Sequence, residues 1–315
     1  MSNETIFETI TFVIVTWNQF VLTKSCIDSI YKQFSTKARI ILVDNGSDDY
    51  SGTLLKNCFP EIFLITFQHN FGPTYAFVIG LQKALEFNDS FIFLLNNDTV
   101  LEPMCSYELV KTLKLDDTLA MAFPIMLFKD EPTRIWSAGI RTFLGLRVSY
   151  RDEYLSNIPE KAFYIHAAPF CGVLFRRETL ETIGFPDTHY KLYYEDWDYC
   201  RRVRMNNKKM AIQPQSLLYH AVSASSGGEY NRFKAYWLAK SNIRYDSFHS
   251  AKLYFPFALL INFITYFLKI INMFFKSNNQ VTFAYLQGFW DGIQEIYWQR
   301  KPKHSQFDIF SEPNS

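Results

Sequence analysis

The first 125 residues alternate between short apolar runs and longer stretches with helical character. We expect strands at five apolar runs: 11–17, 38–44, 62–67, 90–96 and 119–126. Helices are predicted between them, at about 20–34, 51–58, 74–87 and 102–114. The apolar runs are rich in Ile, Val and Phe on both faces, which is typical of parallel strands covered by helices on both sides. The pattern therefore predicts a doubly wound α/β fold with a mostly parallel sheet and helices on both faces.

Polar residues stand at the ends of four successive predicted strands. These clusters cover 16–18, 44–48, 68–72 and 96–98. In an open α/β sheet the ligand binds outside the carboxyl ends of the strands. Turn formation explains any one cluster, because Asn and Asp are favoured in turns, but four in succession favour a nucleotide-type site. The candidate nucleotide-binding residues are Thr16, Asn18, Asp44, Asn70, Gly72, Asn96, Asn97 and Asp98.

Asp98 is the first candidate for a metal ligand. A nucleoside diphosphate leaving group carries negative charge, which a divalent cation held by a carboxylate can neutralise as the bond breaks. Asn96, two residues earlier, binds metal only weakly, so a second ligand is needed. His220 ends a predicted strand, directly before a run of small residues that could fold over a diphosphate. Its alternative role is that of an ordinary hydrogen-bonded histidine.

Asp44 and the stretch from Asn70 to Gly72 are candidates for nucleoside and phosphate contacts. A carboxylate at Asp44 can accept a hydrogen bond from the imide N–H of uracil or thymine, or from a ribose hydroxyl. The alternative is a turn or cap, because Asn-Gly-Ser follows it directly. Gly72 permits close backbone approach, and the helix that follows presents its N-terminus, which favours anions.

The chain after residue 126 has a looser pattern. Residues 127–168 predict irregular or short-strand structure, 169–176 a strand, and 177–184 a short helix that stops at Gly184. Residues 193–205 predict a helix with Tyr193 on its apolar stripe, and two further strands are predicted at 209–213 and 216–222.

Glu195 and Asp196 are the candidate catalytic residues. Displacement at a sugar carbon needs a general base to take the proton of the attacking hydroxyl. A carboxylate in the first turn of a helix, beside the aromatic rings of Tyr194 and Trp197, could be held near a sugar acceptor. The alternative is that these acids only cap the helix, with Asp198 and Arg202 forming an i,i+4 pair.

Residues 253–275 are almost entirely apolar, and Lys252, Lys269 and Lys276 flank or interrupt them. The length permits a membrane span, an interfacial hairpin or a buried core helix. Length and aromatic content favour contact with a membrane. The tail from 303 is polar, and we expect it to be disordered.

Composition narrows the remaining possibilities. The net charge is +1 with no basic block, which gives no reason to expect nucleic-acid binding. The number of cysteines, five, is odd and they form no CxxC pair, so free thiols in a reducing compartment are expected rather than a disulfide framework. The first residues lack a basic region and a small-residue cleavage site, so we predict a cytoplasmic catalytic part.

Taken together, these segments resemble the family 2 glycosyltransferases with a GT-A fold, and within them the rhamnosyltransferase-like branch. The segments "VIVTWN", "ILVDNGSDD" and "HNFGPTYAFVIGLQKAL" are similar to the family's nucleoside-binding half, and "FLLNNDT" to its metal-binding motif. The long segment "FCGVLFRRETLETIGFPDTHYKLYYEDWDYCRRV" is similar to its acceptor and catalytic-base region. "YH" looks like its late histidine, and "FAYLQGFWDGI" at 283–293 looks like a C-terminal segment of the same branch.

The resemblance implies an inverting transfer from a nucleotide sugar, assisted by Mg²⁺ or Mn²⁺. Carried over by position, Asp44 would contact the nucleoside, Asp98 the metal, and Asp196 the acceptor hydroxyl as general base. The chain departs from the family pattern at two places: Pro73-Thr74-Tyr75, where small residues are usual, and Lys240-Ser241-Asn242, where an Arg-Asn pair is usual.

The predicted organisation has four parts. These are a nucleotide-sugar-binding half at 1–125, an acceptor-binding half of the same GT-A domain at 126–248, a membrane-associating helical segment at 249–302 and a tail at 303–315.

We therefore predict a non-processive glycosyltransferase that builds a cell-surface glycan, with a lipid-linked acceptor, at the inner face of the bacterial plasma membrane. TDP-rhamnose is the first donor to test, and UDP-sugars and GDP-mannose stay open. A processive polysaccharide synthase, a sugar nucleotidyltransferase and a non-catalytic sugar- or nucleotide-binding module are the alternatives. The synthase would carry Gln-x-x-Arg-Trp, where this chain has Tyr297 at the Arg position. The nucleotidyltransferase would carry a Gly-rich loop after the first strand, where this chain has none.

Overall fold

The computed structural model of the protein describes residues 10–33, 38–143, 146–221, 231–250, 257, 260, 264 and 279–298. The chain forms two compact units. The first, here called the sheet unit, comprises Met1–Asp187 and Asp196–Ser225. The second, called the helical unit, comprises Thr188–Glu195 and Ser226–Ser315.

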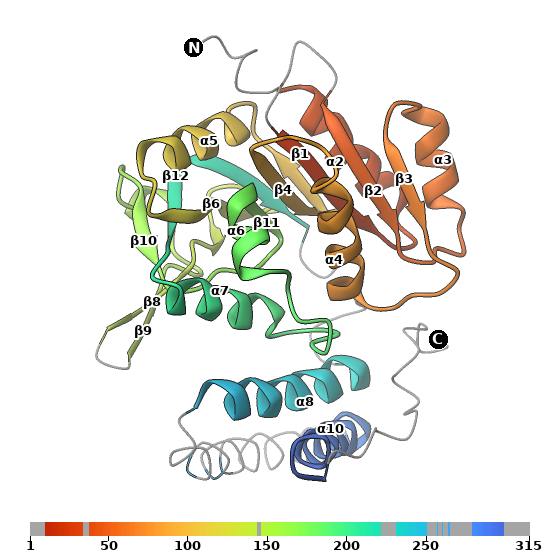
Figure 1. Cartoon of the computed structure of the whole chain (residues 1–315), viewed down its shortest axis with the longest axis vertical. Coiled ribbons are helices and arrows are strands. Elements are labelled where there is room, and N and C mark those ends of the chain that lie inside the picture. Colours follow the sequence, from red (N-terminus) through yellow and green to blue (C-terminus); the bar gives the residue numbers. More distant parts are fainter. Residues whose placement is uncertain are drawn as a thin grey trace. The chain divides into compact units, whose positions relative to one another are not determined.

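A ten-stranded mixed sheet forms the centre of the sheet unit (Figure 1). Its strands are β1 (Ile10–Thr16), β2 (Arg39–Asp44), β3 (Phe63–Thr66), β4 (Phe91–Asn96), β5 (Thr99–Leu101), β6 (Leu119–Phe128), β7 (Ile135–Ser137), β10 (Phe163–Ile165), β11 (Gly172–Arg176) and β12 (Lys209–His220). The main order is β10-β12-β6-β11-β4-β1-β2-β3, while β5 pairs with β12 and β7 with β6. A separate hairpin joins β8 (Ile140–Phe143) to β9 (Leu146–Ser149).

The four strands β3, β2, β1 and β4 run parallel, as the apolar runs predict. Their carboxyl ends therefore lie along one edge of the sheet. Beyond β4 the sheet becomes mixed, because β11 enters antiparallel between β4 and β6. This insertion carries the residues before β11 to the same edge, since the start of β11 pairs with the end of β4 through Gly172 and Leu95.

Helices cover both faces of the sheet, as predicted. They are α2 (Phe20–Tyr31), α3 (Ser51–Cys58), α4 (Pro73–Ala84), α5 (Cys105–Leu115), α6 (Arg177–Ile183) and α7 (Glu195–Met205), with one 3-10 turn at Leu155–Asn157. Successive side chains of a strand point to opposite faces. Phe12 and Ile14 accordingly pack in the core under α2, α3 and α5, whereas Val13 and Val15 pack in the core under α4, α6 and α7. Helix α4 packs mainly on β1 and β2 (Figure 1).

Two predicted elements differ from the structure. The predicted helix at 193–205 begins only at Glu195, because Tyr193 and Tyr194 have left-handed backbones with φ of 65° and 69°. Tyr193 is therefore not part of the helical stripe. The two strands predicted at 209–213 and 216–222 form one strand, β12, which has an irregularity between Gln213 and Leu217. In the sequence this irregularity appears as a break in the apolar pattern, and a loop would produce the same break.

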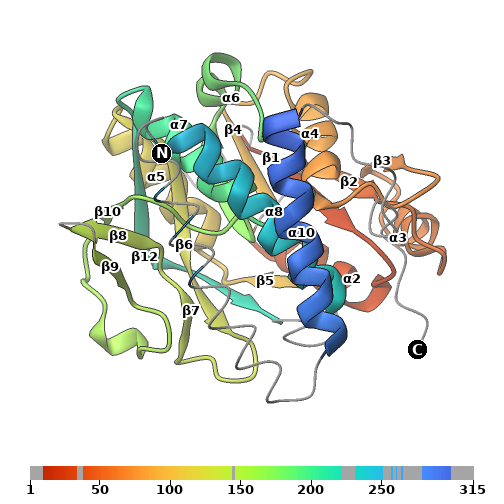
Figure 2. The same cartoon turned by 90° about the horizontal axis from the view of Figure 1, so that it is seen from below.

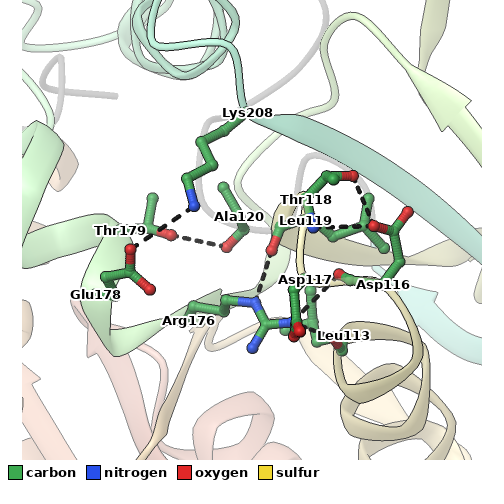
Figure 3. Close-up of polar contacts among 10 residues, drawn as sticks. All are labelled: Leu113, Asp116, Asp117, Thr118, Leu119, Ala120, Arg176, Glu178, Thr179 and Lys208. Atoms are coloured by element: carbon green, nitrogen blue, oxygen red, sulfur yellow. Dashed lines mark hydrogen bonds and ion pairs between the residues drawn. The ribbon is translucent and has the colours of Figure 1, made fainter.

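An arginine pair at the end of β11 joins the sheet to helices on its two faces. Arg176 donates through Nε to the carbonyl of Leu119 at 2.7 Å and through Nη2 to the carbonyl of Leu113 at the end of α5 (Figure 3). Arg177 donates to the carbonyls of Leu85 and Phe87, directly after α4. Cations near helix C-termini satisfy carbonyls that have no intrahelical partner. The "RR" of the sequence therefore has a structural role.

The helical unit contains α8 (Arg232–His249) and α10 (Asn279–Trp298), which lie side by side (Figure 2). Two glycines allow this close packing. A Cβ at Gly288 would overlap the carbonyl of Tyr236, and one at Gly292 would lie 3.1 Å from Cβ of Ile243. One residue that departs from the family pattern, Lys240, contributes to the contact between the two helices. Lys240 pairs with Glu295 at 3.2 Å.

In the part of the chain that the structure describes, no helix is long and apolar enough to cross a membrane. The predicted membrane-contacting segment at 253–275 lies outside the described residues, except for Phe257, Leu260 and Ile264. The small-residue loop after His220 and the tail from 303 also lie outside them. All five cysteines are free thiols.

Candidate active site

Asp98 and His220 meet at the carboxyl edge of the sheet. Asp98 stands in the tight link between β4 and β5, and β5 pairs antiparallel with the end of β12, so that Thr99 lies opposite His220. A further bond, from the N–H of Ala221 to the carbonyl of Asp98 at 2.9 Å, closes this arrangement. The side chains then meet, with Nε2 of His220 3.2 Å from Oδ1 of Asp98. Both residues are buried, at 6% and 5% exposure.

This pair fits one divalent cation. Two ligands on neighbouring vertices of an octahedron with metal bonds of about 2.1 Å are about 3 Å apart, close to the observed spacing. Within the described residues, Oδ1 of Asp98 has no hydrogen bond of good geometry, and a cation would satisfy this buried oxygen. The described part of the chain contains no cluster of three or more His, Cys, Asp or Glu suited to a metal. The other positions would fall to water and to oxygens of the diphosphate.

Cys171 contacts Asn96 at the end of β4. The side-chain amide of Asn96 donates to its Sγ at 3.3 Å, and the backbone N–H of Asn96 donates to its carbonyl at 3.0 Å. Burial raises the pKa of the Cys171 thiol, His220 lowers it, and the charges of Asp98 and Asp196 raise it. Both carboxylates therefore lie within electrostatic range of this one thiol.

The protonation of His220 reflects the same neighbours. Burial lowers its pKa, but Cys171 and Asp98 raise it by more, to about 10. Both neighbours therefore favour the protonated imidazole in the absence of a cation. A bound cation would replace that proton, since a metal-ligating imidazole must be neutral at the ligating nitrogen.

Trp136 packs against His220, a contact that the sequence did not predict. The two rings are edge to face, with centroids 4.4 Å apart. Trp136 belongs to β7, and the guanidinium of Arg151 lies 5.7 Å from the centroid of its ring. The region 127–168 shows only an irregular pattern in sequence, so nothing there marked this tryptophan. Its packing restricts the orientation of the imidazole.

Asp196 occupies the first turn of α7. Its Oδ1 accepts a hydrogen bond from the backbone N–H of Trp197 at 2.7 Å. Burial raises its pKa to about 6, although backbone hydrogen bonds oppose this rise. The Asp198–Arg202 pair that the structural alternative predicts is present, at 2.8 Å, and Asp196 is not part of it. Asp196 is thus a carboxylate with the pKa of a base that works near neutral pH.

The remaining candidates of this segment have packing roles in the structure. Trp197 is half-buried against the core under α7. Tyr194 and Glu195 belong to the helical unit. There the hydroxyl of Tyr194 accepts a hydrogen bond from Asn242 at 2.7 Å, and its ring lies 5.3 Å from that of Tyr245. An acceptor contact by Tyr194 or Trp197, and a catalytic role of Glu195, stay predictions.

Asp44 uses both carboxylate oxygens within its own loop. Oδ1 accepts from the N–H of Ser47 at 3.0 Å, and Oδ2 accepts from the N–H of Gly52 at 3.1 Å, in the first turn of α3. Any Cβ at Gly52 would overlap this carboxylate. The cap is therefore present. Each oxygen has a second lone pair, so the nucleoside contact stays a prediction.

Amide side chains tie the carboxyl ends of β1, β2 and β3 together. Asn45 donates to Oδ1 of Asn70 at 2.9 Å and accepts from the N–H of Phe71 at 3.1 Å. The same Oδ1 of Asn70 accepts from the N–H of Gly72, which has φ of 91° and precedes α4. Asn18 accepts from the N–H of Asp48 at 2.7 Å. The predicted polar clusters are thus adjacent.

Thr16 and Asn97 lie deeper in the same edge. Asn97 donates to Thr23 at 3.1 Å and to Gln19 at 3.2 Å, while Thr16 and Thr23 share a hydroxyl contact of 2.7 Å. Thr16 is 1% exposed and Asn97 8%. Thr16 and Asn97 therefore hold the carboxyl ends of β1 and β4 against the start of α2. Of the predicted set, Asp98 belongs to the candidate cation pair, Asn96 and Asn97 directly precede it in the chain, and the others lie at the carboxyl ends of β1 to β3.

Comparison with known proteins supports the resemblance to family 2 glycosyltransferases. The model of the family "Glycosyl transferase family 2" matches residues 11–184. A curated relative, galactofuranosyltransferase GlfT1 of Mycolicibacterium smegmatis, is 25% identical over 211 residues, which cover 62% of this chain and 65% of that protein. The match therefore spans slightly less than two thirds of the relative's length.

Two solved structures share the fold at low sequence identity. One is GalNAc-T7 with UDP, GalNAc and Mn²⁺, with a TM-score of 0.56 and 16% identity, covering 76% of this chain and 51% of that one. The other is residues 1–349 of S. aureus TarS, with a TM-score of 0.54 and 11% identity, covering 94% and 76%. Both have the GT-A fold, which is therefore the fold of the mixed sheet described above.

Proposed function

The chain belongs to glycosyl transferase family 2, and from this we propose that it is a non-processive, inverting enzyme that moves a sugar from a nucleotide sugar to a growing cell-surface glycan or lipid-linked acceptor. One observation carries the proposal. The Asp98–His220 pair is buried at the carboxyl edge of the sheet, and the charge of Asp196, whose own pKa is raised, acts together with that of Asp98 on the Cys171 thiol. This combination supplies a place for a leaving diphosphate and a base for the attacking hydroxyl.

Asp98 and His220 would hold the divalent cation. When bound, the cation neutralises the charge that develops on the leaving nucleoside diphosphate. An imidazole beside a carboxylate suits Mn²⁺ better than Mg²⁺, which prefers oxygen ligands alone. The solved structure of GalNAc-T7 contains Mn²⁺ together with UDP, which supports the same choice.

Asp196 would act as the general base. It takes the proton of the acceptor hydroxyl while that oxygen attacks the anomeric carbon from the face opposite to the diphosphate. The bond from the anomeric carbon to the phosphate oxygen breaks, and the nucleoside diphosphate leaves with its electron pair. With a pKa of about 6, Asp196 is roughly nine-tenths ionised at pH 7 and still basic enough to accept the proton. Attack from the opposite face inverts the configuration.

The donor we favour carries a pyrimidine base. Asp44 stands at the end of β2, where a free lone pair can accept from the imide N–H of uracil or thymine. TDP-rhamnose remains the first donor to test. The galactofuranosyltransferase relative and the UDP in the GalNAc-T7 structure make UDP-sugars equal candidates. We further propose that the acceptor is lipid-linked and that transfer takes place at the inner face of the plasma membrane, as the apolar segment at 253–275 suggests.

The experiment that tests the reaction is a donor screen with product analysis. Purified protein is incubated with TDP-, UDP- and GDP-sugars, Mn²⁺ and a lipid-linked or oligosaccharide acceptor, and the anomeric configuration of the product is determined by NMR. We expect one nucleotide to support transfer with inversion. Retention of configuration would contradict the role of Asp196. Binding of a nucleotide with no transfer to any acceptor would favour the non-catalytic binding module.

A further inference from the structure

Helix α10 turns large apolar side chains away from α8. The residues buried between the two helices include Val281, Ala284 and Tyr285. On another side of the same helix, Phe283 is 65% exposed, Leu286 46% and Trp290 52%. We call these three residues the outer stripe. Their spacing of three and four residues places them on one face of the helix.

Both acids of α10 are used against α8. Asp291 accepts a hydrogen bond from the hydroxyl of Tyr236 at 2.8 Å. Glu295 pairs with Lys240 at 3.2 Å and with Arg244 at 2.9 Å. Asp291 and Glu295 are the only acidic residues within 279–298. A surface helix usually presents charged residues to solvent, whereas this helix presents Phe, Leu and Trp and keeps its carboxylates at the contact with α8.

The chain before α10 has the same character. Between Asp246 and Asp291 the only charged residues are three lysines, Lys252, Lys269 and Lys276. Within that stretch the described residues Phe257, Leu260 and Ile264 are 61%, 54% and 50% exposed and repeat the spacing of the outer stripe. The region is therefore apolar and exclusively cationic in sequence, and it exposes apolar side chains on two helical segments of the helical unit.

We infer that the outer stripe of α10 docks on the surface of an anionic lipid bilayer. An interfacial helix buries its apolar face at the boundary between headgroups and acyl chains, and Trp and Phe are favoured at that depth. Lysines add attraction to anionic headgroups, and a carboxylate on the docking face would oppose it. The separation of charges in α10 fits this partner. The inference rests on the proposed function in one respect, because the docking would bring the enzyme to a lipid-linked acceptor.

The test is sedimentation of the full chain with vesicles. One set contains phosphatidylglycerol and phosphatidylcholine in equal amounts, and the other contains phosphatidylcholine alone. The test variant is the double substitution Phe283→Gln, Leu286→Gln. The matched control is Val21→Gln, Leu115→Gln, which changes two apolar side chains of the sheet unit that are 74% and 79% exposed. Circular dichroism melting of each variant confirms that it is folded.

We expect the wild type and the control to bind the anionic vesicles, and the Phe283→Gln, Leu286→Gln variant to bind at least about tenfold more weakly. Binding to the neutral vesicles should be weaker for every protein. Equal binding by the variant, equal binding to neutral vesicles, or no binding by the wild type would overturn the inference. So would a wild-type dimer in sedimentation equilibrium that the variant abolishes, because the stripe would then be a protein interface.

A parallel assay separates this inference from the proposed function. Release of nucleoside diphosphate in the absence of vesicles should be equal in the wild type and the Phe283→Gln, Leu286→Gln variant, because neither residue belongs to the candidate active site. If the wild type binds vesicles but releases no nucleotide from any donor and acceptor, the proposed function fails while the docking surface stands. If it releases nucleotide but ignores vesicles, the docking surface fails alone.

Discussion

Nε2 of His220 lies 3.2 Å from Oδ1 of Asp98, although the two residues are far apart in the sequence. The pairing of β5 with β12 creates this contact, because it places the residue after Asp98 opposite His220. A carboxylate and an imidazole at this separation can share a proton or a cation. Substitutions at the pair and at its neighbours distinguish the sharing of a proton from the binding of a cation.

Replacement of either partner should weaken Mn²⁺ binding. We expect Asp98→Asn and His220→Gln each to lower the affinity for Mn²⁺, in the presence of UDP, by at least about tenfold, since each removes one protein ligand. Electron paramagnetic resonance of free Mn²⁺ measures this directly. His249→Gln, in α8 of the helical unit, is the control and should bind like the wild type. Unchanged affinity in both test variants would mean that the cation binds elsewhere.

Trp136 should act through the position of His220. Trp136→Phe keeps an aromatic edge near the imidazole, so we expect nearly unchanged Mn²⁺ affinity. Trp136→Ala removes the contact of 4.4 Å between the rings, and we expect Mn²⁺ affinity to fall several-fold. Both variants are measured by the same titration and by thermal melting. Equal Mn²⁺ affinity in Trp136→Ala and the wild type would restrict this tryptophan to a packing role.

Asp196 should set the acid limb of the pH profile. Because burial raises its pKa to about 6, kcat/KM should fall about tenfold per pH unit below that value as the base becomes protonated. Asp196→Asn should lower kcat by about 10²-fold or more and remove this limb, while nucleotide binding is retained. A profile that is flat between pH 5 and pH 7 in the wild type would argue against Asp196 as the base.

Asp196 should lower the free energy of unfolding of the protein above pH 6. The pKa of Asp196 is higher in the folded protein than its ordinary value of 3.8, so the folded state holds the proton more tightly and loses stability as the pH rises from about 4 to about 6. Asp196→Asn removes this loss. We expect the variant to be more stable than the wild type at pH 8, by up to about 3 kcal/mol, and equally stable near pH 3.5. Urea unfolding at both pH values checks the sign.

The arginine pair after β11 should matter for stability and not for chemistry. Arg177→Ala leaves the carbonyls of Leu85 and Phe87 without their donor, and we expect a loss of about 2–4 kcal/mol in the free energy of unfolding. Arg177→Lys keeps the charge but cannot donate to both carbonyls at once, so its free energy of unfolding should lie between those of the wild type and Arg177→Ala. At 15 °C, where both variants are folded, turnover per folded molecule should match the wild type.

The sequence was sufficient to predict the sheet, its helices and the edge at which the polar residues gather, because strand-length apolar runs and polar strand ends are local signals. The His220 prediction also came from a local signal, a histidine at a strand end. The contacts around it were not visible. Trp136 and Cys171 reach His220 only through the mixed part of the sheet, where β11 and β7 pair with strands distant in sequence. Pairing between distant strands has no local signature.

Some predicted residues proved to have a clear structural partner. Asp44 bonds Gly52 in the first turn of α3 with one oxygen and Ser47 with the other, and Tyr194 bonds Asn242 in the helical unit. Sequence cannot separate such contacts from ligand contacts, because the same residue types serve both. The stripe prediction for Tyr193 was wrong for another reason. The left-handed backbones of Tyr193 and Tyr194 delay the start of the helix to Glu195, and nothing in the side-chain pattern reports φ.

The most direct test of the account is the release of nucleoside diphosphate by purified protein, measured with acceptor present, with and without Mn²⁺, for the wild type, Asp98→Ala and Asp196→Asn. Asp130→Ala, at an exposed aspartate, is the control. We expect the wild type and the control to release nucleoside diphosphate only when Mn²⁺ is present. Both test variants should lose this release, and only Asp98→Ala should lose Mn²⁺ binding. Release that persists without Mn²⁺ and in Asp98→Ala would contradict the account.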